Sequence, residues 1–168
     1  KKKILAPVLA LTAILALAVI IWRIVSTKEA VLPPKIENSL AIISFENQTG
    51  DKAYDYLQKA LPNLLITNLE NTGLFYVATW ERMYDLLEQM GRDDVELIDR
   101  DLGFEVCRRE GIEAIVVGSF VKAGDIFATD VKILNVESKK IIKSATSRGE
   151  GVRSILERQI DELSKEIF

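Results

Sequence analysis

The sequence predicts an α/β (α+β) sandwich, in which helices pack on a mixed sheet of about five strands, preceded by one transmembrane helix. Two observations predict it. An apolar run covers residues 4–25, and beyond residue 38 short apolar stretches alternate with segments whose apolar residues recur at helical spacing. The expected order βαβααβββα joins a parallel or mixed first half to an antiparallel meander.

The apolar run at residues 4–25 follows a basic flank of three lysines at residues 1–3. As a helix it is roughly 33 Å long, enough to cross a hydrocarbon core of about 30 Å. A cleaved signal peptide is the alternative, but its apolar region is usually only about 7–15 residues long. We expect a single span in a bacterial inner membrane. The lysines favour a cytoplasmic amino end and a periplasmic or otherwise extracytoplasmic carboxyl-terminal domain.

The segment at residues 26–38 is polar and contains Pro33 and Pro34, which favour extended backbone. It predicts a short semi-rigid stalk. Residues 39–45 then read as a buried strand, and residues 53–69 as a helix that Pro62 should kink or divide. Residues 74–78 predict the second strand.

The second half begins with a helix from residue 80 to residue 90, capped by Thr79. Another helix is expected at residues 102–109, closed by Gly111. The antiparallel strands follow at residues 114–121, 126–136 and 140–147, the first two joined by a tight turn at Gly124. The α/β domain is therefore expected at residues 39–150 and an amphipathic helix at residues 151–168, with Ser154 and Glu157 as a capping box.

Charge and composition exclude several function classes. Residues 36–168 carry sixteen basic and twenty-four acidic side chains, which argues against nucleic acid and against an anionic lipid surface as partners. The sequence contains no histidine, so it has no histidine base or histidine metal ligand. We therefore expect no catalytic residue, no cofactor and no metal site.

The best-placed ligand or partner loop follows the first strand, because ligand crevices form beyond the carboxyl ends of strands in open α/β sheets. It lacks a phosphate-binding glycine signature, so an ordinary capped turn is the alternative. The loop comprises Glu46, Asn47, Gln48, Thr49, Gly50 and Asp51.

The terminal helix carries an apolar stripe spaced like a coiled-coil seam: Leu156, Ile160, Leu163 and Ile167. It either packs on its own sheet, which we favour, or forms a partner surface or a rigid lead into a following helical array. For the domain as a whole we expect a protein partner or self-association. The acidic residues between Asp93 and Asp101 lack the spacing of an EF-hand and read as solvated carboxylates. Cys107 lies near two arginines that would lower its pKa, although a buried structural thiol is the favoured reading.

The stretch Phe45-Glu46-Asn47-Gln48-Thr49-Gly50-Asp51 resembles the strand-and-turn opening of the TolB amino-terminal-domain-like family. The likeness continues at residues 64–69, 102–103, 114–125 and 131–138. It departs at Leu61-Pro62, where relatives often have a glycine. The resemblance implies a non-enzymatic α/β module of bacterial envelope proteins, including relatives of the curli-secretion lipoproteins. Such modules also follow a transmembrane helix in signalling proteins, some of which carry tetratricopeptide repeats or a cytoplasmic serine/threonine kinase.

We therefore expect an extracytoplasmic sensory or protein-interaction domain of a single-pass bacterial signalling protein, a fragment of a receptor-like serine/threonine kinase. The alternative is a structural envelope protein that assists assembly of a secretion or outer-membrane complex. The absence of an initial methionine and of a final helix cap suggests a longer protein. A small-molecule ligand is not identified by the sequence.

Overall fold

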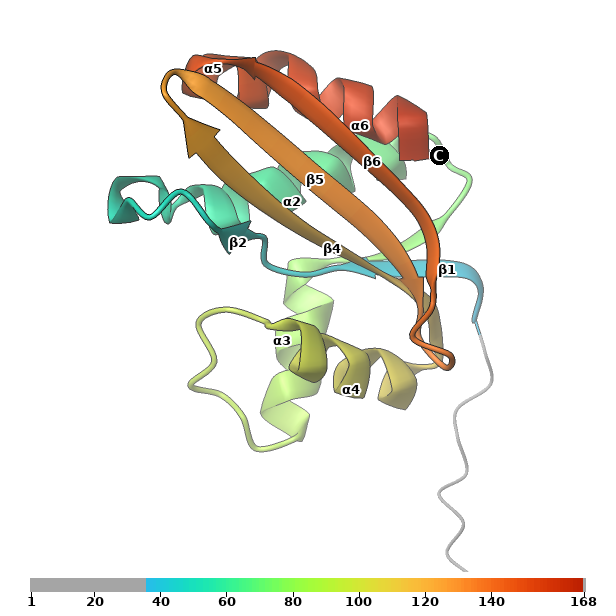
Figure 1. Cartoon of the computed structure of the whole chain (residues 1–168). Helices are drawn as coiled ribbons and strands as arrows, with labels where there is room; N and C mark the ends of the chain where they lie inside the picture. Colours follow the sequence, from blue (N-terminus) through green and yellow to red (C-terminus); the bar gives the residue numbers. More distant parts are fainter. Residues whose placement is uncertain (1–35, 168) are drawn as a thin grey trace, which may run out of the picture. The chain divides into compact units, whose positions relative to one another are not determined.

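The strands form one mixed sheet in the order β3-β1-β4-β5-β6, with helices on both faces (Figure 1). The computed structural model describes residues 36–167. β3 and β4 run parallel to β1, while β5 and β6 continue from β4 as antiparallel neighbours. A short strand, β2, pairs with β4 beyond the end of β1. The strands are β1 Ile36–Ile42, β2 Glu46–Asn47, β3 Tyr76–Ala78, β4 Ile112–Ala123, β5 Ile126–Asn135 and β6 Ile141–Glu150.

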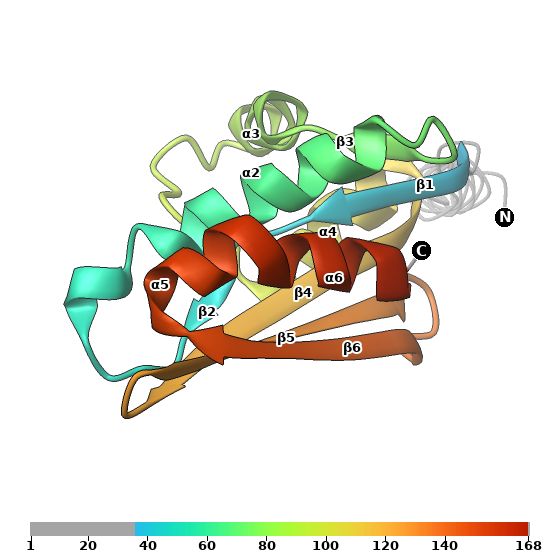
Figure 2. The same cartoon turned by 90° about the horizontal axis from the view of Figure 1, so that it is seen from above.

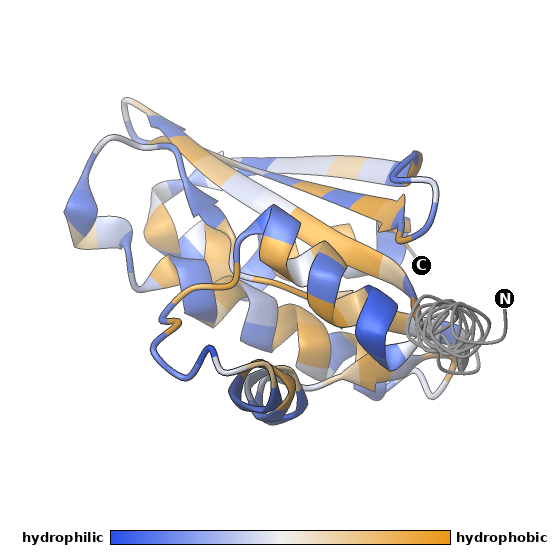
Figure 3. Ribbon diagram, turned by 90° about the horizontal axis from the view of Figure 1, so that it is seen from below, coloured by the Kyte–Doolittle hydropathy of each residue, from blue (hydrophilic) through white to orange (hydrophobic). Residues whose placement is uncertain are grey.

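Two hydrophobic cores lie on the opposite faces of this sheet. Helices α2 (Leu57–Glu70) and α6 (Ile160–Ile167) cover one face, and α3 (Trp80–Gln89) and α4 (Arg100–Glu110) cover part of the other (Figure 2). Hydrophobic and hydrophilic residues accordingly alternate along the helices and the long strands (Figure 3). The predicted mixed sheet with helices packed on it is confirmed.

The local signals for the second half of the chain are mostly confirmed. The Thr79 hydroxyl accepts the Arg82 N–H at the start of α3, and Asp99 caps α4. Gly111 ends α4 at a φ of 75°, and Gly124 adopts a φ of 60° in the β4–β5 turn. Residues with these preferences therefore set the boundaries as expected.

Pro62 does not divide the first helix. α2 runs continuously from Leu57 to Glu70 with Pro62 inside it, after a short 3₁₀ helix, η1, at Lys52–Tyr54. A proline at position 62 cannot donate to the carbonyl of Gln58. That carbonyl instead accepts the backbone N–H of Phe45 at 2.9 Å. The expected division of the helix is thus wrong. A neighbouring segment supplies the missing donor.

The terminal helix begins at Gly151, three residues before the cap predicted at Ser154. α5 begins at Gly151, whose N–H donates to the Asp125 carbonyl at 2.7 Å, and Ser154 lies inside the helix. Its hydroxyl donates to the Gly151 carbonyl, and Glu157 pairs with Arg153. The predicted capping box is therefore wrong. α5 (Gly151–Ser154) continues through a π-helical turn, η2 (Ile155–Gln159), into α6.

Two further expectations concern the amino-terminal part. β1 begins at Ile36, inside the range predicted as stalk. The predicted span at residues 4–25 lies outside the described residues. Within residues 36–167, no helix combines the length and the apolarity that crossing a membrane requires.

Candidate functional site

The helices leave one face of the antiparallel strands uncovered. α3 and α4 pack over β3, β1 and the first half of β4, where Ile115 and Leu134 belong to the second core. Further along, the same face carries polar and partly exposed residues. The strand register aligns them in cross-strand rows: Val117, Lys132 and Ser144; Ser119, Asp130 and Thr146; Val121, Ala128 and Arg148. We call these rows the open face.

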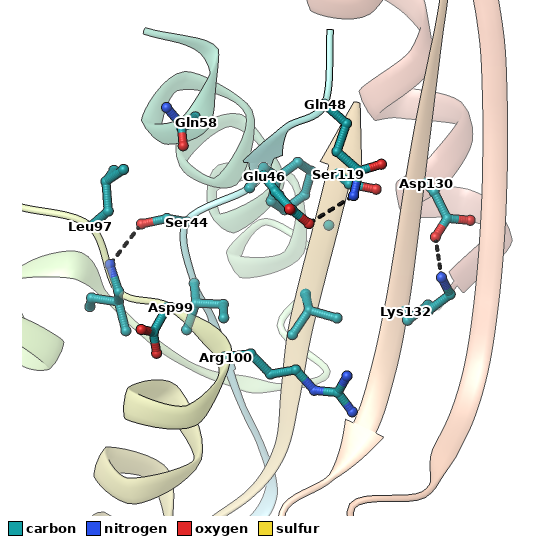
Figure 4. A pocket seen from close by; sticks show the side chains of 15 residues that line it. Ser44, Glu46, Gln48, Gln58, Leu97, Asp99, Arg100, Ser119, Asp130 and Lys132 are labelled. Atoms are coloured by element: carbon teal, nitrogen blue, oxygen red, sulfur yellow. Dashed lines mark hydrogen bonds and ion pairs between the residues drawn. The ribbon is translucent and has the colours of Figure 1, made fainter. Parts of the chain in front are cut away.

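A cavity of about 480 Å³ lies where the open face meets the loop before α4 (Figure 4). Its apolar lining includes Phe45, Val117 and Ile98, and its polar lining comes from β2, α2, α4, β4, β5 and the loops beside them. It lies beyond the carboxyl end of β1, where an open α/β sheet forms its ligand crevice. The polar residues of the lining are Ser44, Glu46, Gln48, Gln58, Asp99, Arg100, Ser119, Asp130 and Lys132.

The charged groups of the cavity are held by near neighbours. Asp130 pairs with Lys132 at 2.7 Å and accepts the Thr146 hydroxyl at 2.8 Å. Gln48 donates from its side-chain amide to Glu46 at 2.8 Å. Arg100 extends from the start of α4 toward the strands (Figure 4), with its guanidinium 5.8 Å from the centre of the Phe104 ring. The cavity therefore presents fixed charges of both signs above an apolar floor.

Only part of the predicted loop reaches this cavity. Glu46 and Gln48 line it, while the other four residues build the turn itself. The Asn47 side chain accepts the Thr49 N–H at 3.0 Å and donates to the Asp55 carboxylate at 2.7 Å. Asp51 caps η1 by accepting the Ala53 N–H at 2.9 Å. The loop thus combines the capped turn with a two-residue contribution to the cavity.

The predicted stripe of the terminal helix is mainly inside the domain. Ile160, Leu163 and Ile167 are buried in the first core, whereas Leu156 is exposed. The π-helical turn places Ile155 in the core instead, because it adds a residue to one turn. The interpretation that the stripe packs on its own sheet therefore holds for three of its four side chains.

The other candidates have local structural roles. Asp99 accepts the Leu102 N–H at 2.9 Å, and Asp93 and Asp94 are exposed. Within residues 36–167, no three His, Cys, Asp or Glu side chains are grouped to hold a metal ion. Cys107 is fully buried, and burial raises its pKa to about 12. Cys107 is therefore a buried structural thiol, the interpretation that we favoured from the sequence.

Of the nine polar residues that line the cavity, sequence reasoning proposed only Glu46 and Gln48 as site residues. Those that it missed include Arg100, Ser119, Asp130 and Lys132. Asp130 and Lys132 interrupt the apolar alternation of β5 on one face only, which marks that face as solvent-accessible. That pattern could have indicated an uncovered surface. The position of the α4 start beside it depends on tertiary packing.

No protein-family model matches the sequence, and no curated protein is detectably similar to it. Solved structures are similar. The C-terminal domain of LpoB from Escherichia coli matches with a TM-score of 0.53 and 17% identity, over 76% of this chain and 93% of that chain. Lipoprotein GNA1162 from Neisseria meningitidis matches with a TM-score of 0.52 and 12% identity, over 69% of this chain and 83% of that chain.

TolB from Acinetobacter baumannii matches with a TM-score of 0.45 and 16% identity, over 75% of this chain and 26% of that chain. At such identities these likenesses concern the fold alone. The chain has the α/β fold of the LpoB C-terminal domain and of lipoprotein GNA1162.

Proposed function

We propose that this chain supplies a non-catalytic protein-interaction domain to a membrane-tethered protein of the bacterial cell envelope. The open face and its cavity are the surface that meets the partner. The fold shared with the LpoB C-terminal domain and with a lipoprotein supports an envelope setting. This favours the alternative in which the domain assists assembly of an envelope complex.

The observation that carries the proposal is the uncovered sheet face. An antiparallel sheet can leave one face to water, but here that face continues into a cavity whose lining includes the buried ring of Phe45. An apolar floor with a few fixed polar groups is typical of binding sites. The side chains of Asp130 and Lys132 form an ion pair with each other. Fixed charges of this kind serve to orient a binding partner, and we do not assign them a role in proton transfer.

Among the described residues of the cavity lining, no serine is hydrogen-bonded to a base. Nucleophilic catalysis by a serine needs an adjacent base. The Ser44 hydroxyl accepts the Ile98 N–H at 3.0 Å, and the chain contains no histidine to activate either Ser44 or Ser119. Binding is therefore the activity that the cavity chemistry supports best.

Site-specific photo-crosslinking tests the proposal. A benzoylphenylalanine replaces Ser144, which is exposed on the open face, or Glu88, which is exposed on α3 away from that face. The full chain is expressed in its source cell and irradiated. We expect a discrete protein adduct from position 144 and none from position 88. No adduct from position 144, or equal adducts from both positions, would contradict the proposal. An adduct with a second copy identifies self-association.

The finer proposal is that the domain belongs to a single-pass signalling protein with a cytoplasmic serine/threonine kinase. The predicted span at residues 4–25 followed by a stalk favours it, whereas the similar structures give this kinase link no support. The reading frame upstream of Lys1 tests it. A kinase domain there supports the signalling proposal, and a methionine codon directly before Lys1 rules it out.

The extracytoplasmic location has its own test. Asp125, exposed in the β4–β5 turn, is replaced by cysteine and treated with a membrane-impermeant maleimide. The native Cys107 gives little background because it is buried. Labelling in spheroplasts supports the proposed orientation. Labelling only in inverted membrane vesicles reverses it.

A further inference from the structure

We propose that the end of the domain at which β1 begins lies on the membrane surface and binds anionic lipid headgroups. This inference rests on the membrane tether in the proposed function. It concerns a surface distinct from the open face. We call it the β1 end, and its residues are Leu74, Tyr76, Ile141, Ile142, Lys140 and Lys143.

Large apolar side chains are exposed at the β1 end. Leu74 is 65% exposed, Ile141 57% and Ile142 59%. Tyr76 is also exposed, on the edge strand β3. Exposed apolar residues that gather in one region mark an interaction surface more often than scattered ones do.

These residues come from distant segments that the fold brings together. The start of β1, the loop before β3, the β5–β6 turn and the end of α6 lie at the same end of the sheet (Figure 2). A cavity of about 250 Å³ connects them, since Phe75 and Leu40 line it together with Ile142 and Lys143. Leu40, Ala114 and Ile133 add to its apolar lining. Its polar lining comes from Asn38, Ser39, Glu113 and Lys143.

Lysines accompany the apolar residues. Lys139, Lys140 and Lys143 are exposed in and beside the β5–β6 turn, against one exposed carboxylate in the turn at Glu137. Lys139 lies 5.1 Å from the centre of the Phe104 ring, which leaves Lys140 and Lys143 to reach outward. Lysines near apolar side chains are the combination that binds an anionic lipid surface.

This local charge is the reason why the proposal departs from the expectation that composition gave. The net negative charge of residues 36–168 argued against an anionic membrane as partner. Surface charges farther apart than a Debye length of about 8 Å are largely screened at physiological salt. The basic β1 end therefore acts locally, although the domain as a whole is acidic.

The short tether makes the β1 end the part of the domain that lies nearest the membrane in this proposal. Ten residues, 26–35, separate the predicted span from β1, and ten residues reach at most about 36 Å. A short tether gives a high effective concentration at the bilayer, so weak contacts suffice. Because β1 begins at the β1 end, that surface is the one the tether holds nearest the headgroups.

The test uses the full chain reconstituted into lipid vesicles. An environment-sensitive fluorophore is attached to a cysteine at Glu137→Cys, in the β5–β6 turn, or at Asp125→Cys, in the β4–β5 turn at the other end of β5. Brominated lipids then quench any fluorophore that touches the bilayer. We expect quenching at residue 137 and none at residue 125, and stronger quenching with phosphatidylglycerol than with phosphatidylcholine alone.

Variants separate docking from tethering. Ile141→Ser with Ile142→Ser, and Lys140→Glu with Lys143→Glu, should each abolish most quenching at residue 137 while the chain still floats with the vesicles. Both pairs are exposed, and the melting curve by circular dichroism checks that the fold survives. A chain that floats without quenching at residue 137 overturns the docking inference alone. Equal quenching in both lipids removes the anionic preference. A chain that fails to float overturns the tether and the docking together.

Discussion

The ring of Phe45 fills the space in which a side chain at Gly118 would stand. A Cβ at position 118 would lie 2.5 Å from Cζ of that ring and 2.6 Å from both Cε atoms. Phe45 is fully buried, so its ring cannot move away without displacing other side chains of the core. The absence of a side chain on β4 thus lets Phe45 cover the strand from the side of the first core, beside the cavity that it helps to line.

Gly118→Ala should destabilise the domain by about 1–3 kcal/mol, because it overpacks this contact. Urea unfolding followed by circular dichroism measures the loss. Adding Phe45→Leu removes the ring, so the double variant should be more stable than the sum of the two single effects predicts. Additive effects would contradict the contact as the cause.

Replacing Gln159 should show how much a buried polar cluster contributes to the stability of the domain. The side-chain amide of Gln159 lies 2.9 Å from the Thr129 hydroxyl and 2.9 Å from the Ser154 hydroxyl, on the π-helical turn. Gln159→Leu leaves the buried Thr129 hydroxyl without this partner and should cost about 1–3 kcal/mol. Gln159→Leu combined with Thr129→Val should recover part of that loss. A double variant as unstable as the sum of both singles would show that the hydrogen bond is unimportant.

The stability of the domain should fall at alkaline pH through Cys107. Burial raises the pKa of this thiol from 9.0 to about 12, so only the unfolded state ionises between those values. The stabilising contribution is fully present below pH 9 and is lost as the pH rises toward 12. Urea unfolding across this range should show a steeper loss for the native chain than for Cys107→Ala. Parallel curves would rule out the thiol as the source.

Glu162 should contribute stability at neutral pH. The Ser147 hydroxyl and then the Arg158 guanidinium donate hydrogen bonds that lower its pKa below the ordinary 4.5. A lowered pKa stabilises the folded state above pH 4.5, and this contribution disappears as the pH falls through the folded value. Glu162→Gln should therefore lower the urea midpoint at neutral pH and approach the native midpoint in acid. A difference that is constant with pH would contradict the charged hydrogen bonds.

The element types were predictable because they depend on local signals. The caps at Thr79 and Asp99 and the glycine at 124 act within a few residues, so the sequence indicates them directly. The way in which the terminal helix is capped was not predictable in this way. It is fixed by the hydrogen bond from Gly151 to Asp125, which exists only once β5 and β6 pair.

The candidate site was predictable only at Glu46 and Gln48. Their loop follows the first strand, and strand ends are where crevices form. Arg100 and Asp130 are thirty residues apart, and they line one cavity because α4 packs beside an incompletely covered sheet. Periodicity indicates which face of a strand is polar, but it does not show which helices leave that face open.

The hydrogen bond from Phe45 to the Gln58 carbonyl has a consequence for how the domain assembles. Inside the helix that contains Pro62, the carbonyl of Gln58 lacks its usual donor four residues later. Its partner comes from the segment after β1, thirteen residues earlier, so helix and strand end become ordered as one unit. The Phe45 amide should exchange its hydrogen as slowly as the amides of α2, although it belongs to no strand or helix.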